Sequence, residues 1–278
     1  MISNSTKVWI FILISSLTLL ILGYEIGERL GLLIGFLLAV SLNFFVFFYG
    51  ESQVLKSMHA KELKGQDSWG LHELVMKYAD HVGIPHPDLY LIPSQTETAF
   101  CVNHSWRKGS MAISMGLLHG FSKEDLEAVI AFQICYLKKL DSFAFGVTST
   151  LANAVIGLGR LLDHFWPPNY FLLANQKQKP FMKLFSPLGW TLIKIASGHT
   201  AFFENDLLAA DMIHDRFRLA EVLWRLEGLA QTQPLKAPPC SSHLFIVNPE
   251  GYTQRHLLLK SHPSIEVRLQ KLMGYYPI

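Results

Sequence analysis

The stretch SKEDLEAVIAFQICYLK, from Ser122 to Lys138, decides the fold because it is the best-marked helix of the sequence. Ser122 is a residue type that caps helix N-termini well, and Asp125 follows it at the spacing of a capping pair. Beyond this start, apolar residues recur at helical spacing. The pattern predicts one helix that runs through to Lys138.

Short apolar segments on the N-terminal side of this helix predict a small sheet. In residues 85–93, polar and apolar side chains alternate and a proline stands at each end, which favours a strand. Residues 99–102 and 110–114 are further apolar segments, and the polar turn between them favours a hairpin. Upstream, residues 71–82 have helical spacing. We therefore expect an α+β fold that is mostly helical, with a small antiparallel sheet.

The N-terminus carries two uncharged apolar runs, Val8 to Gly23 and Leu30 to Tyr49. Each is near the roughly 20 apolar residues that cross a hydrocarbon core. The alternatives are a cleaved signal peptide for the first run and a buried core helix for the second. The first run lacks a small-residue cleavage site and the second follows at once, which favours a transmembrane hairpin over residues 1–50.

Positive charge flanks this hairpin on its outer sides. Lys7 precedes it, and Lys56, Lys61 and Lys64 follow it. The positive-inside rule therefore predicts that the N-terminus and a main domain over residues 51–278 lie in the cytoplasm.

Two later segments, residues 142–162 and 181–196, are apolar enough to be predicted as further membrane segments that interrupt the domain. Lys183 and Pro187 weaken the second prediction. The alternative for each is a hydrophobic helix in a soluble core. After them, residues 205–229 predict one polar-faced helix and residues 264–273 a short amphipathic helix.

Charge and cysteine content exclude some classes of function. The net charge is +2, and no basic stripe interleaved with aromatic residues is present, which argues against nucleic-acid binding. The chain has three cysteines, Cys101, Cys135 and Cys240. Their odd number and wide spacing favour reduced thiols over disulfides. Cys135 lies on the Ser122–Lys138 helix, where a small buried hydrophobe is the better interpretation than a nucleophile.

Five local patterns occur in a fixed order along the chain. They are Leu89 to Pro93 followed by Thr98-Ala99-Phe100; Gly116-Leu117-Leu118; Ser122 to Ala131; His243 to Pro249; and Ser261-His262-Pro263 with Glu266 and Arg268. In this order, after an apolar hairpin, they resemble the HtpX-type membrane zinc metalloendopeptidases over nearly the whole chain. The resemblance implies a zincin-like metallopeptidase domain with transmembrane helices, in a bacterial inner membrane.

In that family, a His-Glu-x-x-His motif and a later Glu-x-x-Ala-Asp pattern supply three zinc ligands and a catalytic glutamate. Carried over by position, the first ligand becomes Phe132, the glutamate becomes Gln133 and the second ligand becomes Tyr136. The third ligand position falls on Phe202, or on Ala201 in a register one residue earlier.

These residues predict a site that has lost its chemistry. A catalytic zinc has three protein ligands, and none of the side chains at these positions binds zinc. We therefore expect no cofactor, although active members of the family use zinc. Gln133 does not accept a proton at neutral pH, and loss of a general base alone costs on the order of 10² to 10⁴ in rate. We expect no catalytic residue and no hydrolysis by the family mechanism.

Other groups do not complete a metal site. His72-Glu73 lacks a second histidine, because Met76 stands four residues on. A displaced site that uses Glu204, with His199 and His214 nearby, stays open as an alternative. It is weakened because the sequence contains no pair of histidines at i and i+4.

What replaced the ligands suggests another role for their space. Phe132 and Tyr136 share one helix face, and with Phe202 opposite, three rings would fill the former site and stabilise the fold without metal. The family pairs an extended substrate with an edge strand, which corresponds here to Thr98, Ala99 and Phe100. Such main-chain pairing needs no metal.

The sequence therefore predicts a membrane-anchored pseudoprotease in membrane-protein quality control. Its expected partners are the bilayer and either unfolded membrane-protein segments or an active homologous protease. The alternative is an active membrane zinc metalloendopeptidase with a displaced metal site or with catalytic groups from a partner. A third possibility is a membrane structural protein that kept the fold and lost peptide binding.

Overall fold

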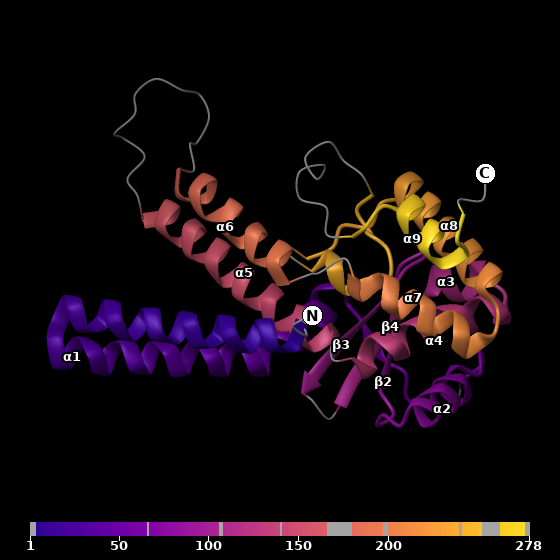
Figure 1. Ribbon diagram of the computed structural model, residues 1–278, viewed down its shortest axis with the longest axis horizontal. Helices are drawn as coiled ribbons and strands as arrows, with labels where there is room; N and C mark the ends of the chain where they lie inside the picture. The colour runs from indigo at the N-terminus through magenta and orange to yellow at the C-terminus, as the bar shows by residue number, and fades with distance from the viewer. Residues whose placement is uncertain are drawn as a thin grey trace, which may run out of the picture.

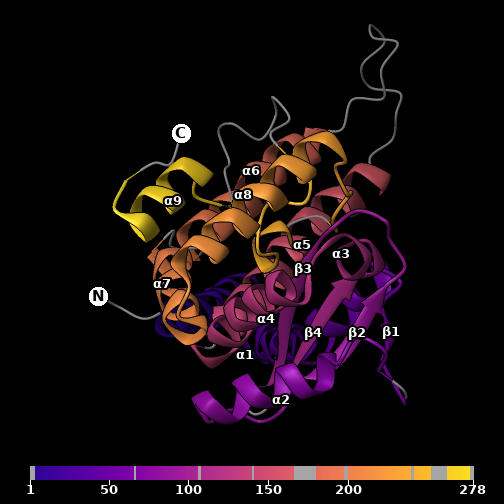
Figure 2. The same cartoon turned by 90° about the vertical axis from the view of Figure 1, so that its right-hand side faces the viewer.

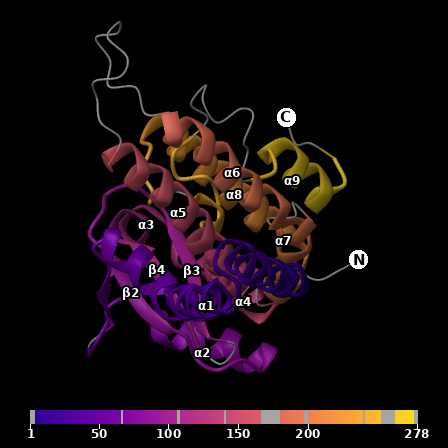
Figure 3. The ribbon, with the colours of Figure 1, turned by 90° about the vertical axis from the view of Figure 1, so that its left-hand side faces the viewer.

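A four-stranded sheet and the helices around it lie at one end of the molecule, and two helical hairpins project from this end (Figure 1). This arrangement comes from a computed structural model that describes residues 4–65, 67–105, 108–139, 141–165, 180–196, 200–238, 241–251 and 262–275. Figure 3 views the projecting hairpins from their far end, with the sheet behind them.

The first hairpin is α1 (Asn4–Ser57), whose two arms run antiparallel in Figure 1. The chain reverses at Gly27 and Glu28, where the backbone leaves helical geometry and Glu28 has φ 46°. The arms approach closely at Gly23 and Gly31, because a Cβ atom on either residue would collide with the carbonyl oxygen of the other. Small residues at helix crossings permit this close backbone contact.

The α1 hairpin leaves many large apolar side chains exposed, Ile26 at 85% being the most exposed. Its C-terminal end differs, since Val54 and Leu55 belong to the main hydrophobic core. Within the described part of the chain, no helix combines the length and the apolar character that a membrane crossing requires.

The sheet contains β1 (Lys61–Glu62), β2 (Asp88–Ile92), β3 (Ala99–Ser105) and β4 (Lys108–Ser114), in the order β1-β2-β4-β3. Strands β3 and β4 pair antiparallel, as the sequence predicts. The prediction of a purely antiparallel sheet is wrong, because β2 pairs with β4 in parallel. The returning strand of the β3–β4 hairpin inserts beside β2 and leaves β3 at the edge. Alternation along each strand does not encode this choice of neighbour.

Helix boundaries near the sheet follow local signals. Helix α2 (Leu71–Val82) has the predicted bounds and ends at Gly83, whose φ of 72° suits glycine. Helix α3 (Met115–Gly120) begins where Ser114 Oγ accepts a hydrogen bond from Leu117 N at 3.1 Å. Helix α4 (Lys123–Lys138) begins where Ser122 Oγ accepts one from Asp125 N at 3.2 Å. The predicted start of α4 is thus confirmed.

The second hairpin consists of α5 (Asp141–Phe165) and α6 (Pro180–Ala196), which pack along each other. The two apolar segments at residues 142–162 and 181–196 are therefore both helical. A Cβ atom on Gly189 would lie 3.0 Å from the carbonyl oxygen of Ala152, so these helices also approach closely. The entry of these helices into a membrane stays a prediction.

The predicted single helix over residues 205–229 is wrong, because the chain forms α7 (Thr200–Ile213) and α8 (Arg216–Thr232) instead. His214 has φ 55°, which breaks the helix. Asp215 then caps α8 by accepting a hydrogen bond from Arg218 N at 2.8 Å. A short 3-10 helix, η2 (Ser242–Leu244), and α9 (Ile265–Met273) complete the described elements near the C-terminus.

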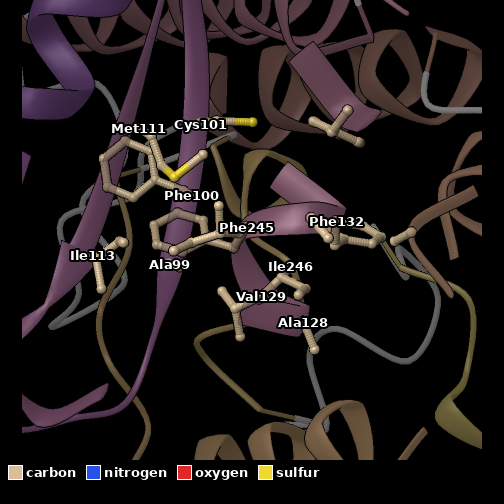
Figure 4. Close-up of a cluster of buried hydrophobic side chains, with 14 of the residues drawn as sticks. Ala99, Phe100, Cys101, Met111, Ile113, Ala128, Val129, Phe132, Phe245 and Ile246 are labelled. Atoms are coloured by element: carbon tan, nitrogen blue, oxygen red, sulfur yellow. The ribbon is translucent and has the colours of Figure 1, made fainter. Parts of the chain in front are cut away.

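The core is built around α4, which packs against β3 on one side and against α2, α7 and α8 on others (Figure 2). Every residue of α4 from Ala128 to Leu137 is buried. Figure 4 shows side chains of β3 and β4 meeting those of α4, with Phe245 and Ile246 from a distant segment between them. The predicted ligand positions Phe132 and Tyr136 on α4 therefore lie in the interior.

Candidate functional site

The three residues at the predicted ligand positions lie together as one aromatic cluster, Phe132, Tyr136 and Phe202. Phe132 and Tyr136 are one turn apart on α4, with ring centroids 5.9 Å apart and planes inclined by 22°. Phe202, on α7, lies 5.8 Å from the Tyr136 ring. None of the three is more than 1% exposed. Such spacings are favourable for aromatic pairs, so the cluster contributes packing energy where α4 meets α7.

The hydroxyl of Tyr136 has a fixed partner within this cluster. It donates a hydrogen bond of 2.8 Å to the main-chain carbonyl of His243. His243 begins a buried stretch, the 243–247 segment (His243 to Val247). The residue at the second predicted ligand position therefore binds protein backbone.

A buried ion pair borders the aromatic cluster. Arg268 on α9 donates to Asp206 on α7 from Nε at 2.9 Å and from Nη2 at 2.6 Å. The Arg268 guanidinium also lies 5.4 Å from the ring centres of Phe132 and of Phe202. Burial raises the pKa of Asp206, and the Arg268 charge acts against that rise. The carboxylate is thus used to hold α9 against α7.

His262 lies on the other side of Phe202, with ring centroids 4.8 Å apart. Its Nε2 is 2.9 Å from the carbonyl oxygen of Phe245, and since a carbonyl only accepts, the proton is on Nε2. Glu266, which belongs to the same sequence pattern, is exposed on the first turn of α9. The pattern thus supplies two buried polar residues, His262 and Arg268, and one exposed residue, Glu266.

Gln133 stands at the predicted position of the catalytic base and is fully buried. Among the described residues, neither amide atom of its side chain finds a hydrogen-bond partner. Its main-chain carbonyl accepts a weak hydrogen bond from Cys101 Sγ at 3.8 Å. A neutral amide in this apolar setting has no basic nitrogen or oxygen with which to activate water.

The residues present do not fit zinc. Zinc takes thiolate, imidazole or carboxylate ligands, whereas this site offers two phenyl rings and a phenol already bonded to a carbonyl. In the described part of the chain, no group of three or more His, Cys, Asp or Glu residues is arranged to hold a metal ion. No catalytic step through zinc follows from this donor set, and the absence of a bound metal stays a prediction.

The alternative metal residues are not brought together. Glu204 is on the surface and accepts a hydrogen bond of 2.6 Å from Lys139 Nζ. His214 is ten residues further along, about 15 Å at the rise of a helix, which is too far for one ion. His199 lies outside the described residues. His72 pairs instead with Asp67, at 3.2 Å.

Cys135 is a buried thiol rather than a nucleophile. Burial raises its pKa to about 12, so it stays protonated at neutral pH. Its Sγ lies 3.1 Å from the sulfur of Met212.

The predicted substrate-binding edge, Thr98 to Phe100, is at the outer strand of the sheet but is itself buried. On its inner side, Thr98 N donates to Ser114 Oγ at 3.0 Å. On its outer side, Ile246 N donates to Ala99 O at 3.2 Å. This part of the edge is therefore paired with the chain's own 243–247 segment. Peptide binding there stays a prediction.

Sequence reasoning missed the role of Arg268. Its signal was its position, because Arg268 falls on the apolar face of α9 that Ile265, Leu269 and Leu272 define. A charged residue on a buried face predicts a buried partner. The partner itself, Asp206, is 62 residues away and carries no local signal.

Comparisons with known proteins agree with this architecture. The sequence profile of peptidase family M48 matches residues 66–275. A protein named Protease HtpX homolog from Sulfurovum sp. (strain NBC37-1) is 30% identical over 272 residues, covering 94% of this chain and 96% of the relative. A protein of the same name from Desulfatibacillum aliphaticivorans is 29% identical over 267 residues, covering 93% and 86%.

A solved structure also resembles the fold. The crystal structure of S. mikatae Ste24p aligns with a TM-score of 0.50 and 18% sequence identity, over 96% of this chain and 66% of that one. At this identity the likeness concerns the fold alone.

Proposed function

We propose a function from one established premise: this chain belongs to peptidase family M48. We propose that it keeps the family's fold without its hydrolytic chemistry, as a membrane-anchored pseudoprotease. Its role is then to bind polypeptide, or an active homologous protease, in membrane-protein quality control. One observation carries the proposal: the aromatic cluster of Phe132, Tyr136 and Phe202 fills the predicted metal site and is sealed from solvent.

The chemistry of hydrolysis supports inactivity from two independent sides. A zinc-bound water is a strong nucleophile only because the metal lowers its pKa, and the aromatic cluster supplies no ligand for the metal. A general base is worth on the order of 10² to 10⁴ in rate, and the Gln133 amide cannot serve as one. The buried setting of Gln133 also leaves the attacking water without access.

Attachment to a bilayer is part of the proposal. It is supported by the large apolar side chains that α1 exposes on both arms, including Leu13, Leu17, Leu33 and Phe36. Exposed apolar surface of this extent marks an interaction site. An alkaline carbonate wash of membranes that contain the full-length protein tests this attachment, because an anchored protein stays in the membrane pellet. Release of the protein by carbonate would contradict anchoring.

A binding role follows from what remains when chemistry is removed. The fold still offers its exposed surface to a homologous protease or to unfolded membrane-protein segments. The outer side of Ala99 is engaged by Ile246. A polypeptide therefore binds either after displacement of the 243–247 segment or at another surface.

The decisive experiment measures zinc and proteolysis on the purified full-length protein in detergent. We expect zinc well below one ion per chain and no cleavage of casein. The matched variant Phe132→His/Gln133→Glu/Tyr136→His/Phe202→Glu restores the family's donors, and it is expected to gain zinc if it folds. Stoichiometric zinc in the wild-type protein, with cleavage that Glu204→Ala abolishes, would instead establish the displaced-site alternative.

A further inference from the structure

Two residues of the 243–247 segment, Phe245 and Ile246, lie against the edge of β3, and His243 and Leu244 before them belong to the 3-10 helix η2. Ile246 N donates to Ala99 O at 3.2 Å, and Phe245 forms an antiparallel bridge with Phe100. The Phe100 and Phe245 rings are 4.8 Å apart, and Figure 4 shows them side by side. Main-chain pairing with a buried side chain is how an extended peptide joins a sheet edge.

Three side chains each bind a different carbonyl group of this segment. Tyr136 Oη donates to His243 O at 2.8 Å. His262 Nε2 donates to Phe245 O at 2.9 Å, and Arg268 Nη1 donates to Ile246 O at 2.7 Å. Tyr136 belongs to α4, Arg268 belongs to α9, and His262 precedes α9. The segment is thus fixed from several directions at once.

All five residues of the segment are buried, none more than 1% exposed. Removing it would expose four apolar side chains and leave Tyr136, His262 and Arg268 without these acceptors. Donors left unpaired in an interior are unfavourable. An incoming peptide would have to replace both the apolar contacts and the three acceptors.

We propose that the 243–247 segment is an intramolecular ligand that closes the β3 edge at Ala99 and Phe100 to other polypeptides, and that the Tyr136 hydroxyl is one of its clamps. This deepens the proposed function and rests on it in one respect, because Tyr136 acts as a clamp only where no metal needs its position. The partner that the edge would otherwise take is an extended apolar peptide with an aromatic side chain where Phe245 lies.

The test uses Tyr136→Phe, which removes the hydroxyl and keeps the ring. Tyr78→Phe is the matched control, because Tyr78 is also a buried tyrosine whose hydroxyl donates a hydrogen bond, in this case to Glu127. Hydrogen exchange is followed by mass spectrometry in peptides that cover residues 243–248 of the full-length protein. Loss of one buried hydrogen bond predicts about fivefold faster exchange there in Tyr136→Phe. The control is expected to match the wild-type protein.

A second arm measures occupancy of the edge directly. The probe is a synthetic peptide with the sequence of residues 241–249, in which a photoreactive phenylalanine replaces Phe245. We expect weak crosslinking to the wild-type protein and stronger crosslinking to Tyr136→Phe at residues 98–102. Crosslinking of the wild-type protein as strong as that of the variant would overturn the proposal, as would unchanged exchange in Tyr136→Phe.

If Tyr136→Phe fails to fold, saturable crosslinking of the peptide to residues 98–102 of the wild-type protein still refutes closure of the edge, and its absence supports closure. Zinc content and casein cleavage are measured on the same wild-type preparation. An inactive protein with an open edge refutes only the closure. A zinc-loaded, cleaving protein refutes the proposed function.

Discussion

Arg268 and Asp206 form a bidentate ion pair in which neither side chain is more than 2% exposed. The pair holds α9 against α7. The third guanidinium nitrogen, Nη1, donates a hydrogen bond of 2.7 Å to the carbonyl oxygen of Ile246. In an interior of low dielectric, such a pair offsets its desolvation cost only when the geometry is good and the other donors are satisfied. Here both Asp206 oxygens and all three guanidinium nitrogens of Arg268 make hydrogen bonds.

Arg268→Met is expected to destabilise the protein by about 3–5 kcal/mol at pH 7, because Asp206 is left as an uncompensated buried charge. Without Arg268, burial alone acts on Asp206 and raises its pKa above the unfolded value. The stability that a raised pKa provides is present at low pH and lost as pH rises. The variant should therefore lose less stability at pH 4 than at pH 7, measured by urea unfolding in detergent. The double variant Arg268→Met/Asp206→Leu is expected to recover part of the loss, and a further loss would contradict this account.

Phe202→Ala is expected to cost about 3–5 kcal/mol, because it opens a cavity between Tyr136 and His262 where no solvent reaches. Phe203→Ala is the matched control, since the neighbouring ring is only half-buried and faces Lys271. Thermal unfolding of both variants gives the comparison. Equal losses would mean that the aromatic cluster contributes no special packing.

Glu127→Gln tests the contact between α4 and α2. Glu127 accepts hydrogen bonds from Lys77 Nζ at 2.7 Å and from Tyr78 Oη at 2.5 Å, and these bonds lower its pKa. A carboxylate whose pKa is lowered by folding stabilises the fold at pH values above its pKa in the unfolded protein. This stabilisation is lost as the pH falls through its pKa in the folded protein. We expect Glu127→Gln to cost about 1 kcal/mol at pH 7 and almost nothing below the folded pKa.

The matched control for Glu127→Gln is Asp80→Asn, which removes an exposed carboxylate paired with His86. It should change stability little at either pH. The measurement is urea unfolding at pH 7 and at the lowest pH at which the wild-type protein stays folded. A loss for Glu127→Gln that does not depend on pH would show that the carboxylate charge is unimportant.

Gly31→Ala tests the close approach of the α1 arms, because the added methyl group would collide with the Gly23 carbonyl. Gly27→Ala is the control, since a Cβ atom there meets nothing within 4 Å. Asn43 Nδ2 lies 3.1 Å from Ser16 Oγ across the hairpin, so a Ser16→Cys/Asn43→Cys pair reports arm spacing by disulfide formation. We expect Gly31→Ala to reduce the disulfide yield severalfold. An unchanged yield would mean that the arms are not packed as described.

Local signals predicted the elements well. Ser122 begins α4 through a side-chain hydrogen bond, and Gly83 ends α2 through its positive φ angle. Both signals are local to the chain, and both predicted helix ends are confirmed. The break at His214 was missed because the apolar spacing continues across it. Only Asp215, a good N-cap in the middle of the pattern, hinted at a new helix.

Contacts between distant residues were beyond sequence reasoning. The parallel pairing of β2 with β4 depends on which strand of the β3–β4 hairpin lies next to β2, and both strands contain apolar residues that could pack there. The residues at the predicted ligand positions were identified by resemblance, and their contact depends on α7 lying against α4. The acceptor for Tyr136 is the carbonyl of His243, and every residue has such a group.

The clamp between Tyr136 and His243 joins residues 107 positions apart. A ribosome adds about 5–20 residues each second, so β3 and α4 exist for roughly 5–20 s before the 243–247 segment is made. During that interval the outer edge of β3 is uncovered, and uncovered edges pair with other chains. The nascent chain is therefore most prone to aggregate between the synthesis of α4 and the synthesis of the 243–247 segment. A chaperone would have its greatest effect on yield in that period.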